Sequence, residues 1–183
     1  MSRHDHPTVM YNQETNTILY QGVINEEGCS TVKMLLLDIE NRLMKSNTKQ
    51  PIRLCIDSPG GDYVEGMAIC DMIEALRVPV YTYAVAKAAS AAFKIFIAGK
   101  KRFTYKHSRF LFHSVAGGTR GTQKDVEEDL EDYKRINNEI REYVARRTNI
   151  PQNMIDDTID NCKDLWFTAD EAIKYGIADV LLK

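Results

Sequence analysis

Segments typical of strands alternate with segments typical of helices along the first hundred residues, and this alternation limits the fold most strongly. Stretches rich in β-branched and aromatic residues predict strands at residues 17–23, 52–56, 78–85, 102–105 and 110–112. Apolar residues at helical spacing predict helices at 29–45, 65–76 and 91–98. Strands that alternate with helices predict an α/β fold with a parallel sheet and right-handed crossovers. In such sheets, chemistry is expected at the C-terminal ends of the strands.

A long, heavily charged helix is predicted at residues 124–147, with a narrow apolar stripe. A helix of this kind is not enclosed by a core, so it projects or lies in a subunit contact. The glycine-rich stretch before it can be a flexible edge or hinge, and an edge strand there would offer backbone groups to another subunit. A capped helix from Thr168, a turn at Gly176 and a short strand are expected to end the chain.

The length of 183 residues favours one domain. We expect residues 1–16 to be an N-terminal segment that can be flexible and residues 17–183 to be a single domain. Within this domain, residues of about 115–147 are expected to project as a strand and a long helix, which we call the handle.

Composition excludes several classes of protein. The net charge of -2 gives no basis for binding nucleic acid, and no apolar run approaches the length of a membrane span. The four cysteines lack a metal-binding spacing, so we expect buried thiols in a reducing compartment and no metal or cofactor. A protein of the cytoplasm is the expectation.

Two short runs carry the candidate chemistry. The run Ser58-Pro59-Gly60-Gly61 ends a predicted strand and can present bare backbone N–H groups to an oxyanion. Ser90 stands among alanines where a strand turns into a helix, so the helix dipole favours negative charge near its hydroxyl. Each run also has an ordinary structural explanation, a tight turn or an N-cap serine.

A base and an acid would complete a serine hydrolase. His113 follows the apolar run 110–112 and is the best base candidate, because the other histidines lie in the tail or a polar turn. Spacing alone does not choose the acid among five aspartates: Asp156, Asp157, Asp160, Asp164 and Asp170. Lys87 and Lys94 flank Ser90 at helical spacings, which keeps a Ser–Lys dyad open beside surface or substrate-binding lysines.

These residues resemble the proteolytic subunit of the Clp protease, a family of serine peptidases with a crotonase-like fold. The resemblance runs from the first predicted strand to the C-terminus. It rests on blocks in the same order and at nearly the same spacing: 58–61, 66–69, 88–90, His113, 117–118 and 171–179. The resemblance implies a crotonase-like α/β fold, in which a parallel sheet with crossover helices carries the projecting handle.

The resemblance also implies site roles. Ser90 would be the nucleophile, His113 the general base, and the backbone N–H groups of Gly61 and Ala91 the oxyanion hole. Alignment from the downstream block 164–168 makes Asp164 the third member of the triad. Alignment from upstream would place Asp160 or Asn161 there instead.

The implied function is a serine endopeptidase that cuts peptides or unfolded proteins inside homo-oligomeric heptameric rings, stacked in pairs as a tetradecamer. A Clp ATPase unfoldase is the implied partner, although residues 52–55 lack the aromatic residues with which the family docks it. Three alternatives remain: an inactive ring subunit that partners an active paralogue, a phage-type maturation peptidase independent of a Clp ATPase, and an acyl-CoA crotonase relative.

Overall fold

The computed structural model describes residues 6–48 and 50–183. Of the expected N-terminal segment 1–16, residues 1–5 lie outside the described residues. Residues 8–12, for which the sequence predicted no element, form the strand β1 (Thr8–Asn12), which pairs antiparallel with β2 (Thr17–Gln21). The N-terminal part of the chain therefore contributes an edge strand to the sheet.

The predicted alternation of strands and helices is present, with longer elements than expected at several ends. The central elements are α1 (Glu26–Lys45), β3 (Ile52–Ser58), α2 (Tyr63–Ala75), β4 (Val80–Ala89), α3 (Ala91–Ala98), β5 (Lys101–Tyr105) and β6 (Arg109–Phe112). The remaining elements are α4 (Gln123–Arg147), α5 (Gln152–Asp160), β7 (Leu165–Thr168), α6 (Ala169–Lys174) and β8 (Val180–Leu182). The sequence pattern had not predicted α5 and β7.

One mixed sheet runs through the molecule, and β4 is its branching strand. The strand order is β1-β2-β3-β4-β5-β8, and pairing is parallel from β2 to β8. The first half of β4 pairs with β5, whereas Lys87–Ala89 at its C-terminal end pair with β6. The strand β6 pairs on its other side with β7, antiparallel. The C-terminal ends of β3, β4 and β6 are thereby brought to one region.

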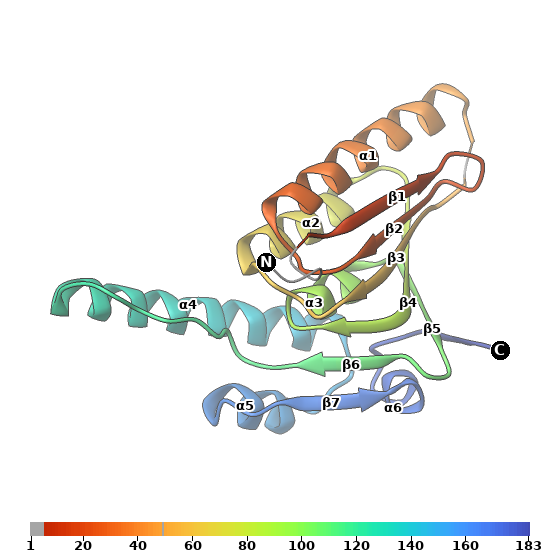
Figure 1. Cartoon of the computed structure of the whole chain (residues 1–183). Coiled ribbons are helices and arrows are strands. Elements are labelled where there is room, and N and C mark those ends of the chain that lie inside the picture. Colours follow the sequence, from red (N-terminus) through yellow and green to blue (C-terminus); the bar gives the residue numbers. More distant parts are fainter. Residues whose placement is uncertain (1–5, 49) are drawn as a thin grey trace.

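Helix α3 lies at the centre of the core. All eight of its residues are buried, and the rings of Phe93 and Phe96 pack against Phe112 and Phe110 of β6. Figure 1 shows α1 and α2 on one side of the strands β1–β3, with α3 enclosed between the strands and the inner end of α4. Burial of this apolar helix fixes the position of the residue that precedes it, Ser90.

The handle projects from the body of the molecule (Figure 1). In α4, only Ile140, Tyr143 and Val144 are buried, all in its C-terminal third. The prediction of a strand in the handle was wrong for the described chain: the segment 113–121 runs beside α4 without strand pairing, because no strand of the same chain lies beside it. The Val115 N–H donates to Asn137 Oδ1 of α4 (2.9 Å), which ties the inner end of this segment to the helix.

The thiols differ from the expectation in one respect. All four are free, with Cys29 and Cys70 buried and Cys55 half-buried, but Cys162 is exposed. The prediction of burial was wrong for Cys162 because this residue lies in the surface turn after α5, with a φ of 49°. Among the described residues, no helix combines the length and the apolar character needed to cross a bilayer.

Candidate active site

The glycine turn after β3 is held from both sides by Ile24. The Ile24 N–H donates to the Gly60 carbonyl (2.8 Å), and the Asp62 N–H donates to the Ile24 carbonyl (2.9 Å). The buried Ser58 hydroxyl accepts from the Gly60 N–H (3.0 Å). Gly60 and Gly61 have φ values of 95° and 150°, which side-chain-bearing residues rarely adopt. These contacts leave the Gly61 N–H without an acceptor among the described residues.

Ser90 sits at a strained junction between β4 and α3. Its φ of 57° and ψ of -120° lie outside the regions that a serine ordinarily populates. Its N–H donates to the Leu111 carbonyl (2.9 Å), which continues the β4–β6 pairing. A strained serine between a strand and a helix is the geometry of a nucleophile elbow, because it exposes the hydroxyl above the sheet.

Two residues with free backbone N–H groups, Gly61 and Ala91, line the same cleft as Ser90. Ala91 is the first residue of α3, so its N–H has no acceptor within the helix. A β-carbon placed on Gly60 would be 2.5 Å from Ser90 Cβ and 3.0 Å from the Ala91 nitrogen, so the glycine turn touches the Ser90 junction. The glycine turn and the start of α3 therefore form one wall of the cleft that contains Ser90.

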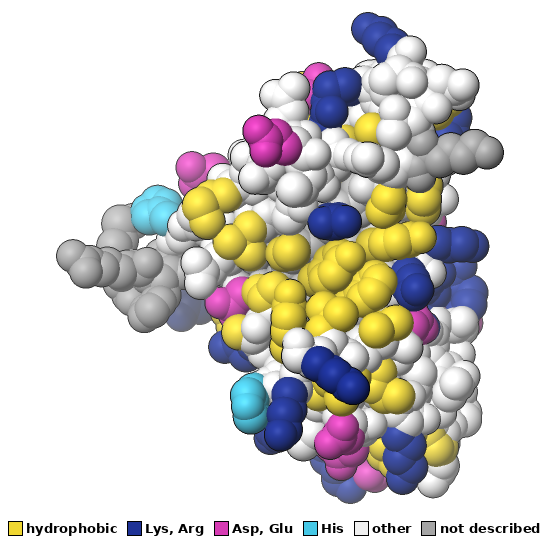
Figure 2. All heavy atoms as spheres, turned by 90° about the vertical axis from the view of Figure 1, so that its right-hand side faces the viewer, with side chains coloured by type: hydrophobic (Ala, Val, Ile, Leu, Met, Phe, Trp, Pro, Cys, Tyr) yellow, Lys and Arg dark blue, Asp and Glu magenta, His cyan; other side chains and the backbone are white. Residues whose placement is uncertain are grey.

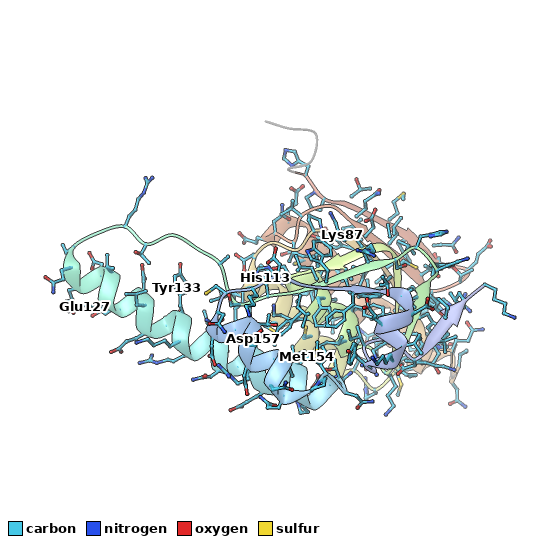
Figure 3. The ribbon with its side chains drawn as sticks, turned by 90° about the horizontal axis from the view of Figure 1, so that it is seen from below. Lys87, His113, Glu127, Tyr133, Met154 and Asp157 are labelled. Atoms are coloured by element: carbon cyan, nitrogen blue, oxygen red, sulfur yellow. The ribbon has the colours of Figure 1, made fainter. Side chains whose placement is uncertain are left out.

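His113 follows the last residue of β6 and closes the same cleft. A cavity of about 350 Å³ is lined by Gly61, Ser90, Ala91, Lys94 and His113, together with residues of the segment 114–116 and of α2 and α4. Figure 3 shows His113 where the chain leaves the body for the handle, with Tyr133 and Glu127 further out along α4. The cleft therefore lies between the body and the root of the handle.

Among the three carboxyl and amide candidates, Asp164 is the one that the strand pairing brings to His113. Phe112 pairs with Leu165 in the β6–β7 ladder, and one further step of this register sets His113 opposite Asp164. Asp160 accepts from Arg141 Nη2 (2.7 Å), and the Asn161 side chain donates to Asp157 Oδ1 (2.7 Å). Both side chains are thus engaged with partners other than His113.

The side chains of this group are not joined by hydrogen bonds. Within residues 6–48 and 50–183, Ser90 Oγ has no recorded hydrogen bond to His113, and no ion pair of 4.0 Å or less joins His113 to Asp164. Catalytic hydrogen bonds are commonly longer in a free enzyme than with substrate bound.

The half-buried His113 ring favours the neutral form. Burial lowers the pKa of His113 below its ordinary value of 6.5, and the nearby Lys94 ammonium lowers it further. The backbone of Ser114 and the Asp164 carboxylate oppose this shift. A neutral imidazole can accept a proton, so this environment suits a base.

The two lysines near Ser90 have different surroundings, which sequence spacing had not distinguished. Lys94 is buried and lines the cleft with Ser90 and His113. Lys87 instead lines a separate surface pocket with Gln21, Asp57 and Pro59. The signal for Lys94 in the sequence is its place as the one charged residue in an otherwise apolar helix.

Comparison with known proteins decides the family. The model of the Clp protease family matches residues 4–183, nearly the whole chain. The chain belongs to the Clp protease family. Two curated relatives are each named ATP-dependent Clp protease proteolytic subunit 2. The protein from Treponema pallidum is 30% identical, and the match covers 93% of this chain and 83% of the relative. The protein from Treponema denticola is 33% identical, and the match covers 92% of this chain and 82% of the relative.

A solved structure agrees with this assignment. A mutant of ClpP1 from Listeria monocytogenes matches with a TM-score of 0.80 and 29% identity, over 93% of this chain and 92% of the other. The predicted ClpP-like α/β fold is confirmed, and the chain is a serine-type peptidase of the ClpP type.

Proposed function

We propose that Ser90, His113 and Asp164 form the catalytic triad of a peptidase that cuts polypeptides, with the Gly61 and Ala91 N–H groups as its oxyanion hole. The observation that carries this proposal is the strained Ser90 junction packed against the glycine turn in a cleft that also contains His113. A strained serine beside two free N–H groups has a clear chemical use in acyl transfer.

Each group then has one task. Ser90 Oγ attacks the peptide carbonyl while His113 accepts the hydroxyl proton, and the carbonyl oxygen becomes an oxyanion held by the Gly61 and Ala91 N–H groups. Collapse of this intermediate breaks the C–N bond, and the leaving amine takes the proton from His113. Water, activated by His113, hydrolyses the Ser90 ester in the second half of the reaction. Asp164 orients the imidazole and stabilises its charged form.

A fluorophosphonate probe combined with a peptide hydrolysis assay tests the triad. The probe is expected to label Ser90, and Ser90→Ala is expected to lose both labelling and hydrolysis while keeping its assembly mass. Ser46→Ala, at the end of α1, is the matched hydroxyl control and should retain both. Failure of the probe to label Ser90 in any oligomeric state would instead support an inactive ring subunit that partners an active paralogue.

The assembly is the second part of the proposal. Peptidases of this family form rings, and we propose heptameric rings of this chain stacked in pairs through the handle. The support is the exposed stripe of α4, where Leu130 is 49% exposed, beside an extended segment whose backbone is free to pair with a second copy. Leu130→Asp should halve the particle mass measured by sedimentation, whereas Glu128→Gln on the same helix should not. A monomeric wild-type protein that cleaves peptides would contradict this assembly.

A Clp ATPase unfoldase is the proposed partner, acting in the cytoplasm. Its support is an aromatic group on β4 and β5, in which the Tyr83 ring stacks on Phe103 with 4.5 Å between centroids, and Tyr81 lies 5.9 Å from the same ring. All three side chains are partly exposed, and Figure 2 shows hydrophobic side chains gathered across the middle of one face. Exposed apolar patches of this kind mark binding surfaces.

Protein degradation with and without a Clp ATPase tests this partnership. Wild type is expected to degrade a folded protein only when the ATPase and ATP are present, and Tyr83→Ala should lose this activity while still cutting short peptides. Equal processing of a specific protein without any ATPase would favour a specialised maturation peptidase of the phage type.

A further inference from the structure

Lys94 is a buried cation for which the described residues supply no anion. Its residue is 3% exposed, in a helix whose other seven residues are apolar and buried. Its one recorded hydrogen bond is a long one, from Nζ to the Ser90 carbonyl oxygen (3.4 Å), and that oxygen also accepts from the Phe93 N–H. No carboxylate of the described chain lies within the 4.0 Å of an ion pair. Two of its three N–H bonds therefore have no acceptor among the described residues.

The groups around Lys94 do not supply the missing negative charge near neutral pH. Cys70 faces it from α2, and burial raises the pKa of that thiol to about 12, so the thiol stays protonated. His113 faces it from the end of β6 and is neutral or positive. Tyr63 and Tyr143 lie on α2 and α4, and burial raises the pKa of each hydroxyl.

Asp62 is the one carboxylate that lines the cleft among the described residues, and it has another task. Its Oδ1 accepts from the Glu65 N–H (2.9 Å) and caps α2. A buried ammonium without a partner is unfavourable unless an opposite charge is provided. Because Lys94 lines the open cleft, a substrate can provide that charge.

The position of Lys94 indicates which part of a substrate it would meet. Lys94 is the fourth residue of α3 and follows Ser90 by one helical turn. Both side chains therefore lie near the N-terminal end of α3. A substrate esterified to Ser90 with its carbonyl oxygen at the Gly61 and Ala91 N–H groups would carry its acyl residue in the cleft that Lys94 lines. The side chain of the residue before the cleaved bond is then the group nearest to Lys94.

We propose that Lys94 makes the cleft selective for an acidic residue, Asp or Glu, immediately before the cleaved bond. The proposal rests on the assignment of Ser90 as nucleophile. An acidic side chain satisfies the buried ammonium, whereas an apolar side chain leaves it unmatched in surroundings of low dielectric. Lys94 is thus a specificity-determining residue.

Two fluorogenic peptides that differ only in Glu or Gln before the leaving group test the selectivity. Wild type is expected to cleave the Glu peptide with a kcat/KM at least 10-fold higher at pH 7. Lys94→Met keeps the length of the side chain and removes its charge, so it should abolish or reverse this ratio. Lys87→Met, which removes the lysine outside the cleft, should leave the ratio as in wild type.

The pH dependence gives a readout that a merely structural lysine would not change. Burial lowers the pKa of Lys94 to about 8. The ammonium is therefore lost as pH rises through about 8, and the Glu-to-Gln ratio of wild type should fall over the same range. In Lys94→Met the ratio should not depend on pH in this range.

Three outcomes would overturn the proposal or separate it from the assignment of Ser90. Equal cleavage of both peptides by a wild type whose Ser90 is labelled overturns the selectivity alone. Loss of all cleavage and labelling in folded Lys94→Met overturns it too, since Lys94 would then be the base. If the probe does not label Ser90, selectivity is tested by binding instead of cleavage. Fluorescent product peptides that end in Glu or Gln are titrated with Ser90→Ala, and their affinities are measured by anisotropy. Equal affinities for the two peptides overturn the proposal.

Discussion

Gly60 lies against Ser90 so closely that a β-carbon on Gly60 would come within 2.5 Å of Ser90 Cβ and 2.6 Å of the Ala89 carbonyl oxygen. The contact joins the two segments that carry the proposed oxyanion donors, although they are thirty residues apart in sequence. Because the contact is to backbone and to Cβ, neither side can move away by rotating a side chain. The glycine at this position therefore sets the distance between the turn after β3 and the nucleophile.

Gly60→Ala should separate these segments and impair the oxyanion hole. Loss of one oxyanion donor typically reduces kcat on the order of 10²- to 10³-fold, and we expect a loss of that size. The strain at a φ of 95° should also lower the free energy of unfolding by about 1–3 kcal/mol. Peptide hydrolysis and thermal unfolding measure the two effects.

Gly118→Ala is the control for the stability part, because a β-carbon there meets no atom within 4 Å. Its melting temperature should stay that of wild type. A Gly60→Ala protein with wild-type kcat would show that the turn does not position an oxyanion donor.

Replacement of the two aspartates near the end of α5 distinguishes the acid of the triad. Asp164→Asn should reduce kcat on the order of 10³- to 10⁴-fold, since an amide holds the imidazole in the wrong tautomer. Asp160→Asn removes only a partner of Arg141 at the surface and should change kcat less than about 3-fold. The steady-state rates of the two variants decide the matter, and the reverse order of effects would assign the role to Asp160.

The nucleophile region was predictable because its signals are local. Small residues around Ser90 predicted the junction of strand and helix, and the bounds of α3 agree with those read from the apolar run 91–98. The family resemblance supplied what local patterns lacked, namely which distant segments meet. Asp164 illustrates the difference: spacing left five aspartates open, the downstream alignment with the family favoured Asp164, and the β6–β7 register sets Asp164 opposite His113.

Other features depend on tertiary contacts that the sequence pattern does not report. The strand β7 is a short edge strand defined by its pairing with β6, and α5 buries Ile155 and Ile159 in the core while Arg141 pairs with Asp156 and Asp160. The burial of Lys94 follows from the burial of the whole of α3, whereas its charge in the sequence had suggested a surface or substrate-binding lysine. The proposed roles of Ser90, His113 and Asp164 stay predictions.

The acid limb of the pH–rate profile should reflect the pKa of His113, and removal of the Lys94 charge should shift it. The base must be neutral, so kcat/KM rises with pH through the pKa of His113, which burial and then the Lys94 ammonium lower below 6.5. Wild type should therefore stay active at lower pH than an unperturbed histidine allows. Lys94→Met removes one of the two causes, so its acid limb should move to higher pH than that of wild type.

This profile is best measured with the Gln peptide, so that substrate charge does not contribute. Lys87→Met is the matched control and should keep the wild-type acid limb. A limb that moves to lower pH in Lys94→Met would contradict the electrostatic coupling between Lys94 and His113.

Arg147 should be a main contributor to stability, because it caps the C-terminal end of the helix that positions Ser90. Its guanidinium donates to the carbonyls of Ile97 (2.8 Å), Ala98 (2.6 Å) and Gly99 (3.1 Å) at the end of α3. Arg147→Met leaves these partly buried carbonyls without a donor, and we expect a loss of about 2–4 kcal/mol in the free energy of unfolding.

Arg146→Met is the matched control, because Arg146 is 61% exposed and forms one ion pair with Glu74, worth at most about 1 kcal/mol. Thermal unfolding of the three proteins at equal concentration and equal assembly mass measures the difference. A melting temperature of Arg147→Met equal to that of Arg146→Met would show that α3 is fixed by its apolar packing alone.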